Sequence, residues 1–478
     1  MIDERLIIKK FAIYGRNIQP SAVEALISRI RPNDLDSAIE HICKTVNSFI
    51  ITKDDIINAL NSFKPEREVI RPVKKEEDRV CDIRVRDITG NSSCEGVIED
   101  FIAYFNSRFE KLSSILMRRM RPVKISSVSN FQNERVEVIG MVRSVREVDD
   151  CVIVELEDKS GTVNVVVGNK LKKDVLELLG DEVIGVYGTV KGRNIIADRI
   201  VLPDIPSKEK VKKDFGIVFT SDTHFGSKEF LKKEWDLFIK WLSGEIGSGK
   251  IAEIASKIKY VIIAGDIVDG IGVYPEQERD LEIKNIYEQY EFSAEQIDRI
   301  PKDIKVIISV GNHDAIRQAE PQPALPKEYR DLFPNNVIHV GNPAFLELDD
   351  VRVLIYHGRS LDDLITKIPR LSYERPQEAM IELLKRRHLC PLYGEKTPIA
   401  PEKEDLLVID EVPDVLHCGH IHTYGVGFYR GVLLVNSSTW QAQTEFQKRI
   451  NLNPMPGNVA VYYNGEVGRL KFYQSIGK

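Results

Sequence analysis

The sequence predicts a multidomain protein with a small all-α N-terminal domain, a five-stranded β-barrel and a C-terminal α/β domain. Its 478 residues are enough for about three domains. Apolar residues recur at helical spacing near the N-terminus and alternate with other residues between positions 134 and 203. After position 215 they form short strand-like runs that end in polar loops. These patterns define the fold class.

The first segment, residues 1–63, has the pattern of short amphipathic helices. Ser21 to Glu24 matches a capping box, and Thr52 precedes an acidic first turn followed by apolar residues. Nothing in this segment points to catalysis, so we expect an interaction domain, with a purely structural bundle as the alternative. Residues 64–94 mix both charge signs with few large apolar side chains, which predicts a linker.

The central part begins with a connecting region, residues 95–130, where an apolar stripe at three- and four-residue steps predicts one long helix. Residues 131–206 have the pattern of five short strands and one short helix, which is typical of an OB-like barrel. Such barrels often bind single nucleic-acid strands on aromatic side chains, but only Tyr187 and Phe131 are obvious aromatic residues here. We therefore favour a packing or subunit-contact role for the barrel.

The overall composition excludes several classes of protein. The net charge is −6, so any contact with nucleic acid must be local or shared with a partner. No apolar run approaches membrane-spanning length, and the N-terminus lacks the pattern of a signal peptide. The six cysteines are scattered without a C-x-x-C motif, which indicates thiols in a reducing compartment. We expect a cytoplasmic protein without membrane association.

The C-terminal region, residues 207–478, contains five apolar runs that each end in a loop with a metal-binding side chain. In open α/β sheets, the loops at the carboxyl ends of the strands converge on one crevice, so these side chains are expected to meet. The candidate ligands are Asp222, His224, Asp266, Asn312, His357, His420 and His422.

The donor set is carboxylate, amide and imidazole without thiolate. This mixture favours manganese, iron(II) or zinc, with magnesium as a further candidate, over calcium or copper(I). Seven ligands exceed the need of one four-coordinate ion but suit two ions about 3.5–4 Å apart that share a ligand and activate water for attack on phosphorus. Asp266 lies in the middle of the pattern and is the expected bridge. Each motif alone is often an ordinary loop, so the prediction rests on all five occurring in order.

The five motifs resemble those of the calcineurin-like metallophosphoesterases, which read D-x-H, G-D-x-x-D, G-N-H-D, H and G-H-x-H. The resemblance implies an α/β fold in which a β-sandwich is flanked by helices. It also assigns each ligand to an ion. One metal would be held by Asp222, His224, Asp266 and His422, and the other by Asp266, Asn312, His357 and His420.

The same resemblance gives roles to three further residues. It implies that His313 is the general acid that protonates the leaving oxygen, and that Asp314 orients it. Asp269 is expected to support a metal ligand from behind.

Two longer segments narrow the resemblance. Residues 385–394 and 436–449, together with the helical domain, linker and barrel, resemble the small subunits of archaeal family-D DNA polymerases. This resemblance covers nearly the whole chain. It implies a 3′→5′ exonuclease that proofreads single-stranded or frayed DNA ends for a separate large polymerising subunit. Manganese is the implied metal, the nucleoid is the implied location, and a sliding clamp is left open as a further partner.

Two alternatives remain at this point. A phosphomonoesterase or protein phosphatase would use the same motifs, although it would need neither the barrel nor the N-terminal domain. An inactive scaffold subunit would lack metal ligands, which this chain retains. The basic run Lys385 to Arg387 is expected either to contact phosphate or to form a surface face, and Gln443 and Glu445 are candidates for the path of the strand.

Overall fold

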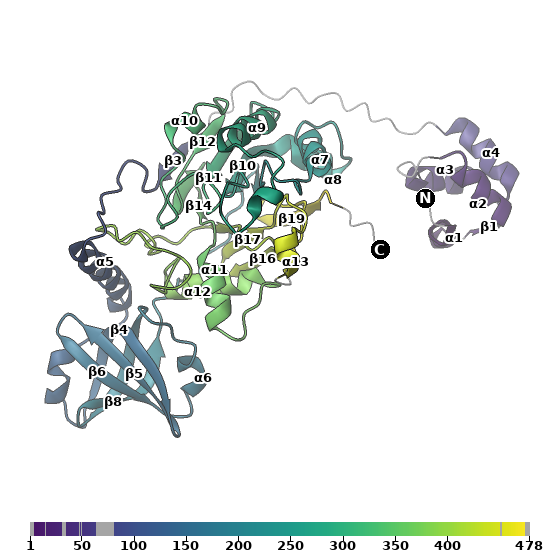
Figure 1. Cartoon of the computed structure of the whole chain (residues 1–478). Helices are drawn as coiled ribbons and strands as arrows, with labels where there is room; N and C mark the ends of the chain where they lie inside the picture. The colour runs from purple at the N-terminus through teal and green to yellow at the C-terminus, as the bar shows by residue number, and fades with distance from the viewer. Residues whose placement is uncertain are drawn as a thin grey trace. The chain divides into compact units, whose positions relative to one another are not determined.

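The structure of the chain is a computed structural model that describes residues 4–14, 16–30, 35–46, 48, 50–63, 81–449 and 452–473. The chain divides into two compact units, Met1–Lys74 and Lys75–Lys478, and each is described by itself (Figure 1). Among the described helices, none has both the length and the apolar character that crossing a bilayer requires.

The N-terminal unit is a small helical bundle. It contains α1 (Glu4–Ile13), α2 (Pro20–Ile27), α3 (Leu35–Thr45) and α4 (Lys53–Ser62), with a parallel pair of short strands, β1 (Asn17–Ile18) and β2 (Ile50–Ile51). Side chains from all four helices form its core, including Phe11, Leu26, Ile42 and Ile56.

The two predicted helix starts in this unit have different outcomes. Thr52 caps α4 as expected, because its hydroxyl accepts a hydrogen bond from the Asp55 amide while the Asp55 carboxylate accepts one from the Thr52 amide. The predicted capping box at Ser21 is wrong. The helix α2 begins at Pro20, so that Ser21 lies inside it, and Gln19 precedes it without a side-chain cap. Proline suits the first helical turn because its missing N–H would have no partner there.

The predicted five-stranded barrel is confirmed. Its strands are β4 (Arg135–Val148), β5 (Cys151–Asp158), β6 (Gly161–Val167), β7 (Val183–Lys191) and β8 (Asn194–Val201), closed in the order β4-β5-β6-β8-β7. The alternating valines explain why it closes, since every second side chain of β5 and β6 points into the barrel core. A short helix, α6 (Lys172–Val175), lies between β6 and β7.

The remaining strands form two six-stranded sheets. The first has the order β12-β11-β10-β9-β18-β19 and the second β16-β17-β15-β14-β13-β3. The first sheet contains β9 (Gly216–Thr220), β10 (Ile258–Ala264), β11 (Lys305–Ser309), β12 (Val337–His339), β18 (Asn458–Tyr463) and β19 (Glu466–Lys471). The second contains β3 (Ile83–Arg86), β13 (Ala344–Leu348), β14 (Val351–Ile355), β15 (Val415–Cys418), β16 (Tyr424–Tyr429) and β17 (Val432–Ser437).

The two sheets pack face to face. One apolar cluster contains side chains of both, such as Phe219 and Ile262 from the first and Val353 and Val435 from the second. Helices cover the outer faces. The first sheet packs against α7 (Lys232–Leu242), α8 (Lys250–Lys257) and α9 (Ile286–Asp298), and the second against α11 (Ser360–Lys367) and α12 (Pro376–Arg386). The central strands β9 and β10 are largely apolar because both their faces are buried.

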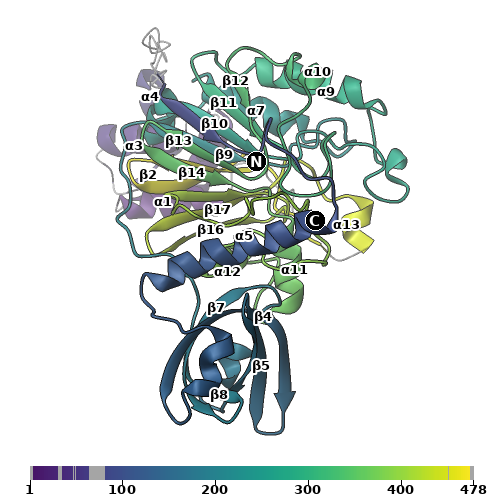
Figure 2. The same ribbon diagram turned by 90° about the vertical axis from the view of Figure 1, so that its left-hand side faces the viewer.

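The connecting region differs in part from the prediction. Residues 83–86, which fall in the predicted linker, form β3 and pair with β13 at the edge of the second sheet. The earlier part of that linker, residues 64–80, lies outside the described residues. The expected long helix is α5 (Ile98–Met117), which lies between the barrel and the sheets (Figure 2).

Candidate metal centre

The candidate ligands lie where strands of both sheets end. The parallel strands β9, β10 and β11 end before the loops that contain Asp222, His224, Asp266 and Asn312. The parallel strands β14 and β15 end before His357 and before the loop with His420 and His422. The packing of one sheet on the other therefore brings seven side chains from five loops to one place.

The backbone at these ligands is strained. Five of the seven have positive φ angles: Asp222 at 51°, His224 at 45°, Asp266 at 51°, His420 at 66° and His422 at 57°. Residues other than glycine rarely adopt this left-handed conformation, and such conformations persist at functional sites where the surrounding structure imposes them.

Two glycines let the loops approach one another closely. A Cβ atom on Gly311 would lie 2.2 Å from Asp266 Oδ1, and one on Gly419 would lie 2.3 Å from Asp222 Oδ2. Any larger residue would displace a carboxylate of the centre. The glycines of the G-N-H-D and G-H-x-H motifs are thus explained by packing against the ligands.

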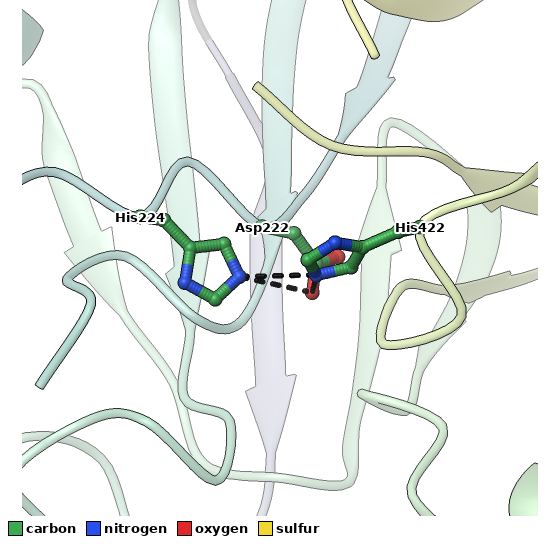
Figure 3. Close-up of side chains that lie close together, drawn as sticks. All are labelled: Asp222, His224 and His422. Atoms are coloured by element: carbon green, nitrogen blue, oxygen red, sulfur yellow. Dashed lines mark hydrogen bonds and ion pairs between the residues drawn. The ribbon is translucent and has the colours of Figure 1, made fainter. Parts of the chain in front are cut away.

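The first ligand group is Asp222, His224 and His422 (Figure 3). The Nε2 atoms of the two histidines lie 3.0 Å apart, and His422 Nε2 lies 3.3 Å from Asp222 Oδ1. Asp222 and His224 are almost completely buried. Three donors that face one another at these distances suit a shared cation.

The second ligand group is Asp266, His357 and His420. His357 Nε2 lies 3.3 Å from Asp266 Oδ2 and 3.1 Å from Asn312 Oδ1. The backbone amide of His420 donates to the carboxylate of Asp222, which connects the two groups. Asp266 Oδ2 also lies 3.9 Å from His224 Nε2, so this carboxylate faces both groups.

A third group joins His313 to His224 and Asp266. His313 Nε2 lies 4.0 Å from Asp266 Oδ2, and the His313 backbone amide donates to Asp266 Oδ1 at 2.9 Å. The His313 side chain is 16% exposed, whereas the Asp266 side chain is only 2% exposed. His313 therefore lies at the open side of the centre, next to the carboxylate that both ligand groups share.

The hydrogen bonds of three imidazoles indicate which nitrogen faces the centre. The Nδ1–H groups of His357 and His313 donate to the carbonyl oxygens of Ala264 and Asp269, at 2.8 and 2.7 Å. His224 Nδ1 lies 3.0 Å from the Asp269 carboxylate. Each Nε2 consequently faces carboxylate oxygens, an arrangement that needs a positive charge, a proton or a metal ion, between them. This donor set fits divalent metal ions.

The pKa values of the protein without any bound ion also indicate that positive charge is favoured at this centre. Burial lowers the pKa of His357, but the Asp266 carboxylate more than offsets this and raises it to about 10. Burial raises the pKa of Asp266, but His357 and His313 outweigh it and hold that pKa well below its usual range. The carboxylates therefore stay ionised and attract either imidazolium protons or bound cations.

Asp269 lies behind the first ligand group. Its carboxylate accepts from His224 Nδ1 and from Gln441 Nε2, at 3.0 and 2.8 Å, and its backbone carbonyl accepts from Gln277 Nε2. The hydrogen bond to His224 holds the ring so that Nε2 faces the centre.

Asp314 does not contact the His313 imidazole through a hydrogen bond, contrary to its expected orienting role. Its carboxylate accepts from the amides of Gly311 and Ile267 and from the hydroxyl of Tyr290. Burial raises the pKa of Asp314 to about 7, and the charge of Asp266 adds to the effect. Asp314 thus holds the loop together, while the carbonyl of Asp269 orients His313.

One residue at the centre lies outside every sequence motif. The Asp362 carboxylate on α11 is 3.0 Å from His420 Nε2. Tyr373 adds a hydrogen bond to that carboxylate, which together with His420 lowers the pKa of Asp362 despite its burial. If Nε2–H of His420 donates to Asp362, Nδ1 is the nitrogen that faces the ligands. No sequence signal marks Asp362, because it follows His357 by five residues in an otherwise ordinary amphipathic helix.

The segment 436–449 packs behind the ligand loops. Asn436 Nδ2 donates to the carbonyl of Gly419, and Thr439 Oγ1 donates to the carbonyl of Asp222. Gln447 Nε2 lies 3.0 Å from His422 Nδ1. Gln443 instead donates to the carbonyl of Leu452. The segment therefore supports both ligand groups.

Two residues of the basic run at the end of α12, Arg386 and Arg387, form neither of the two expected features, a phosphate contact or a surface face, because both are buried. Arg386 and Arg387 are 3% and 4% exposed. Arg386 pairs with Glu382 and Glu182, and Arg387 donates to the carbonyls of Ile409 and Asp410. Both guanidinium groups therefore have their partners inside the protein and not in solvent.

Comparisons with known proteins identify relatives along the whole chain. A family model for the B subunits of DNA polymerases alpha and epsilon matches residues 217–425. The DNA polymerase II small subunit of Archaeoglobus fulgidus is 55% identical and aligns over 99% of both proteins. The protein of that name from Methanothermobacter thermautotrophicus is 42% identical, over 98% of this chain and 99% of its own length. The chain therefore belongs to the family of small subunits of archaeal DNA polymerase II, the family-D polymerase.

Proposed function

We propose that this chain is a metal-dependent 3′→5′ exonuclease that removes nucleotides from single-stranded or frayed DNA ends. In this proposal residues 207–478 are a metallophosphoesterase domain, and the chain assembles with a large polymerising subunit for which it proofreads. The observation that supports it best is the convergence of His224, His357 and His313 Nε2 atoms on Asp266 within 4.0 Å, with their Nδ1 atoms already hydrogen-bonded.

The ligand groups suggest how two metal ions would be held. Asp222, His224 and His422 would hold one ion, and Asn312, His357 and His420 the other, with Asp266 shared between them. When bound, such a pair neutralises charge on the phosphoryl oxygens and activates water for in-line attack. The oxygen and imidazole donors suit manganese, iron(II) or zinc, and we expect manganese among them from the resemblance to the small subunits of family-D polymerases.

His313 is the proposed general acid. Because its Nδ1–H donates to the carbonyl of Asp269, a proton given to the leaving oxygen has to be on Nε2. The acting form is therefore the imidazolium. Burial lowers the pKa of His313, and the neighbouring Asp266 carboxylate offsets part of that effect. The hydrogen bond to Asp269 keeps the ring from turning, so that Nε2 remains at the open side of the centre.

The substrate preference follows from the behaviour of a mispaired terminus. Unpairing and unstacking a base costs a few kcal/mol, and a mismatched base needs the least. A frayed end therefore reaches the buried ligands more often than a paired end. Hydrolysis there would remove the misincorporated nucleotide and return the strand to the polymerising subunit.

The test is digestion of single-stranded DNA with a 5′ label in the presence of manganese. Wild type should give a ladder that shortens from the 3′ end, Asp266→Ala should give none, and His313→Ala should slow the reaction by roughly 10²–10⁴-fold. Faster turnover of p-nitrophenyl phosphate than of DNA would favour a phosphomonoesterase. Absence of bound metal by elemental analysis, together with no digestion, would favour a scaffold subunit.

A further inference from the structure

A cavity of about 600 Å³ opens beside the His313 loop. Two of the residues that line it are the ligand Asn312 and the proposed acid His313. Its far side is formed by the loop after β10 and by the start of α9, at Ile271, Val273 and Ile286. The volume lies within the roughly 300–1,000 Å³ of typical small-molecule sites.

The walls of this cavity are largely apolar. Ile271, Val273, Ile286, Ala315 and Ile316 line it, and Asp314 is the one lining residue with a carboxylate. That carboxylate accepts hydrogen bonds from the amides of Gly311 and Ile267 and from the hydroxyl of Tyr290. It is therefore not available to contact a ligand in the cavity. An apolar wall beside a phosphate-handling centre suits a planar heterocyclic base better than a second phosphate or a charged peptide.

The polar groups lie on the side toward the metal ligands. Gln318 lines the cavity, and its Nε2 donates to the backbone carbonyl of Asn312 at 2.8 Å. The guanidinium of Arg359 donates in turn to Gln318 Oε1 at 3.0 Å. A guanidinium is thereby held beside the cavity, two residues after the ligand His357, where it suits a backbone phosphate.

We propose that this cavity receives the base of the 3′-terminal nucleotide, with its phosphate at the metal ligands. This inference rests on the proposed exonuclease function and adds a reason for its selectivity. A base that is paired and stacked cannot enter a side cavity, whereas a frayed base enters at little cost. Ile271 and the apolar wall would then determine specificity, separately from the groups that carry out the chemistry.

The test compares two chromogenic esters in the presence of manganese. Thymidine 5′-(p-nitrophenyl phosphate) carries a base in the position of the terminal nucleotide, and methyl p-nitrophenyl phosphate has none. Ile271 is 44% exposed, so Ile271→Asp should not affect folding. The matched control is Ile251→Asp, since Ile251 on α8 is 45% exposed and does not line the cavity.

Wild type should prefer the thymidine ester. Ile271→Asp should lower kcat/KM for that ester by about tenfold and leave the methyl ester unchanged, while Ile271→Leu and Ile251→Asp resemble wild type. Binding of thymidine 5′-monophosphate, measured by calorimetry, should weaken in parallel. Turnover of both esters without preference, or an equal loss on both in Ile271→Asp, would overturn the cavity assignment alone. Failure to hydrolyse either ester, or DNA, would overturn the exonuclease proposal and this inference together.

Discussion

Two buried polar clusters in this protein both combine carboxylates with basic side chains, but their charges are arranged differently. At the candidate metal centre, imidazole nitrogens face carboxylates and one another, as in the 3.0 Å approach of His224 and His422. Where α5 and α12 meet the barrel, cations and carboxylates alternate instead. Arg108 pairs with Asp405 at 2.9 Å, and Arg386 pairs with Glu182 at 2.8 Å.

The difference lies in whether the protein supplies its own counter-charges. Arg108 also donates to the carbonyl of Pro391 and to the hydroxyl of Tyr104, and Asp405 accepts from His388. The Arg108–Asp405 pair is therefore satisfied without a ligand. The candidate metal centre has an excess of acceptors whose nearest positive charge would be a proton or a metal ion. Buried histidines and acids therefore indicate a candidate metal site only when the protein itself leaves their carboxylates without enough counter-charge.

The largest expected effect is on folding, in the paired cluster. Arg108→Met would leave the Asp405 carboxylate buried with only His388 as its side-chain partner, and breaking such a pair costs about 3–5 kcal/mol. We expect a lower urea midpoint for the unit that contains the barrel. Manganese affinity of the folded protein should remain at the wild-type value. A loss below about 1 kcal/mol would show that the pair is not essential for stability.

The next effect is a dependence of stability on pH. Burial raises the pKa of Glu382, but Arg386, Lys385 and Arg370 outweigh it and lower that pKa to about 2. Because the folded pKa is below the unfolded value near 4.5, this contribution is present above pH 4.5 and is lost as the pH falls toward 2. The shift corresponds to roughly 3 kcal/mol.

Urea denaturation at a series of pH values measures this contribution. Glu382→Gln should be less stable than wild type at neutral pH and should flatten the pH dependence between about 4.5 and 2. The same slope in the variant and in wild type would assign the acid sensitivity to other carboxylates.

The smallest effect is at the metal centre, and it concerns Asp362. Asp362→Asn should weaken manganese binding by about 10–100-fold, because the partner that orients His420 loses its charge. Calorimetric titration with manganese measures this directly. Asp363→Asn is unsuitable as a control, because the Asp363 carboxylate accepts a hydrogen bond from the Thr397 hydroxyl. The control is therefore Glu378→Gln, on the neighbouring helix. Equal affinities in both variants would remove Asp362 from the centre.

Short-range patterns determined much of this protein. The loops with Asp222, Asp266 and His357 directly follow buried strands, so the order of strand and polar loop is visible in the sequence. The barrel was equally visible, because alternation in β5 and β6 reflects one buried face. Such features depend on neighbouring residues and can therefore be predicted without the tertiary structure.

The tertiary structure alone decided which charges are paired. Arg108 and Asp405 are 297 positions apart, and β3 joins the second sheet by pairing with a strand far along the chain. The basic run at the end of α12 has the pattern of a surface face, yet Arg386 pairs with Glu182 next to the barrel. Asp362 likewise gains its role only where α11 approaches His420. Pairing across such separations depends on how sheets and helices pack, and it therefore cannot be predicted from the local sequence.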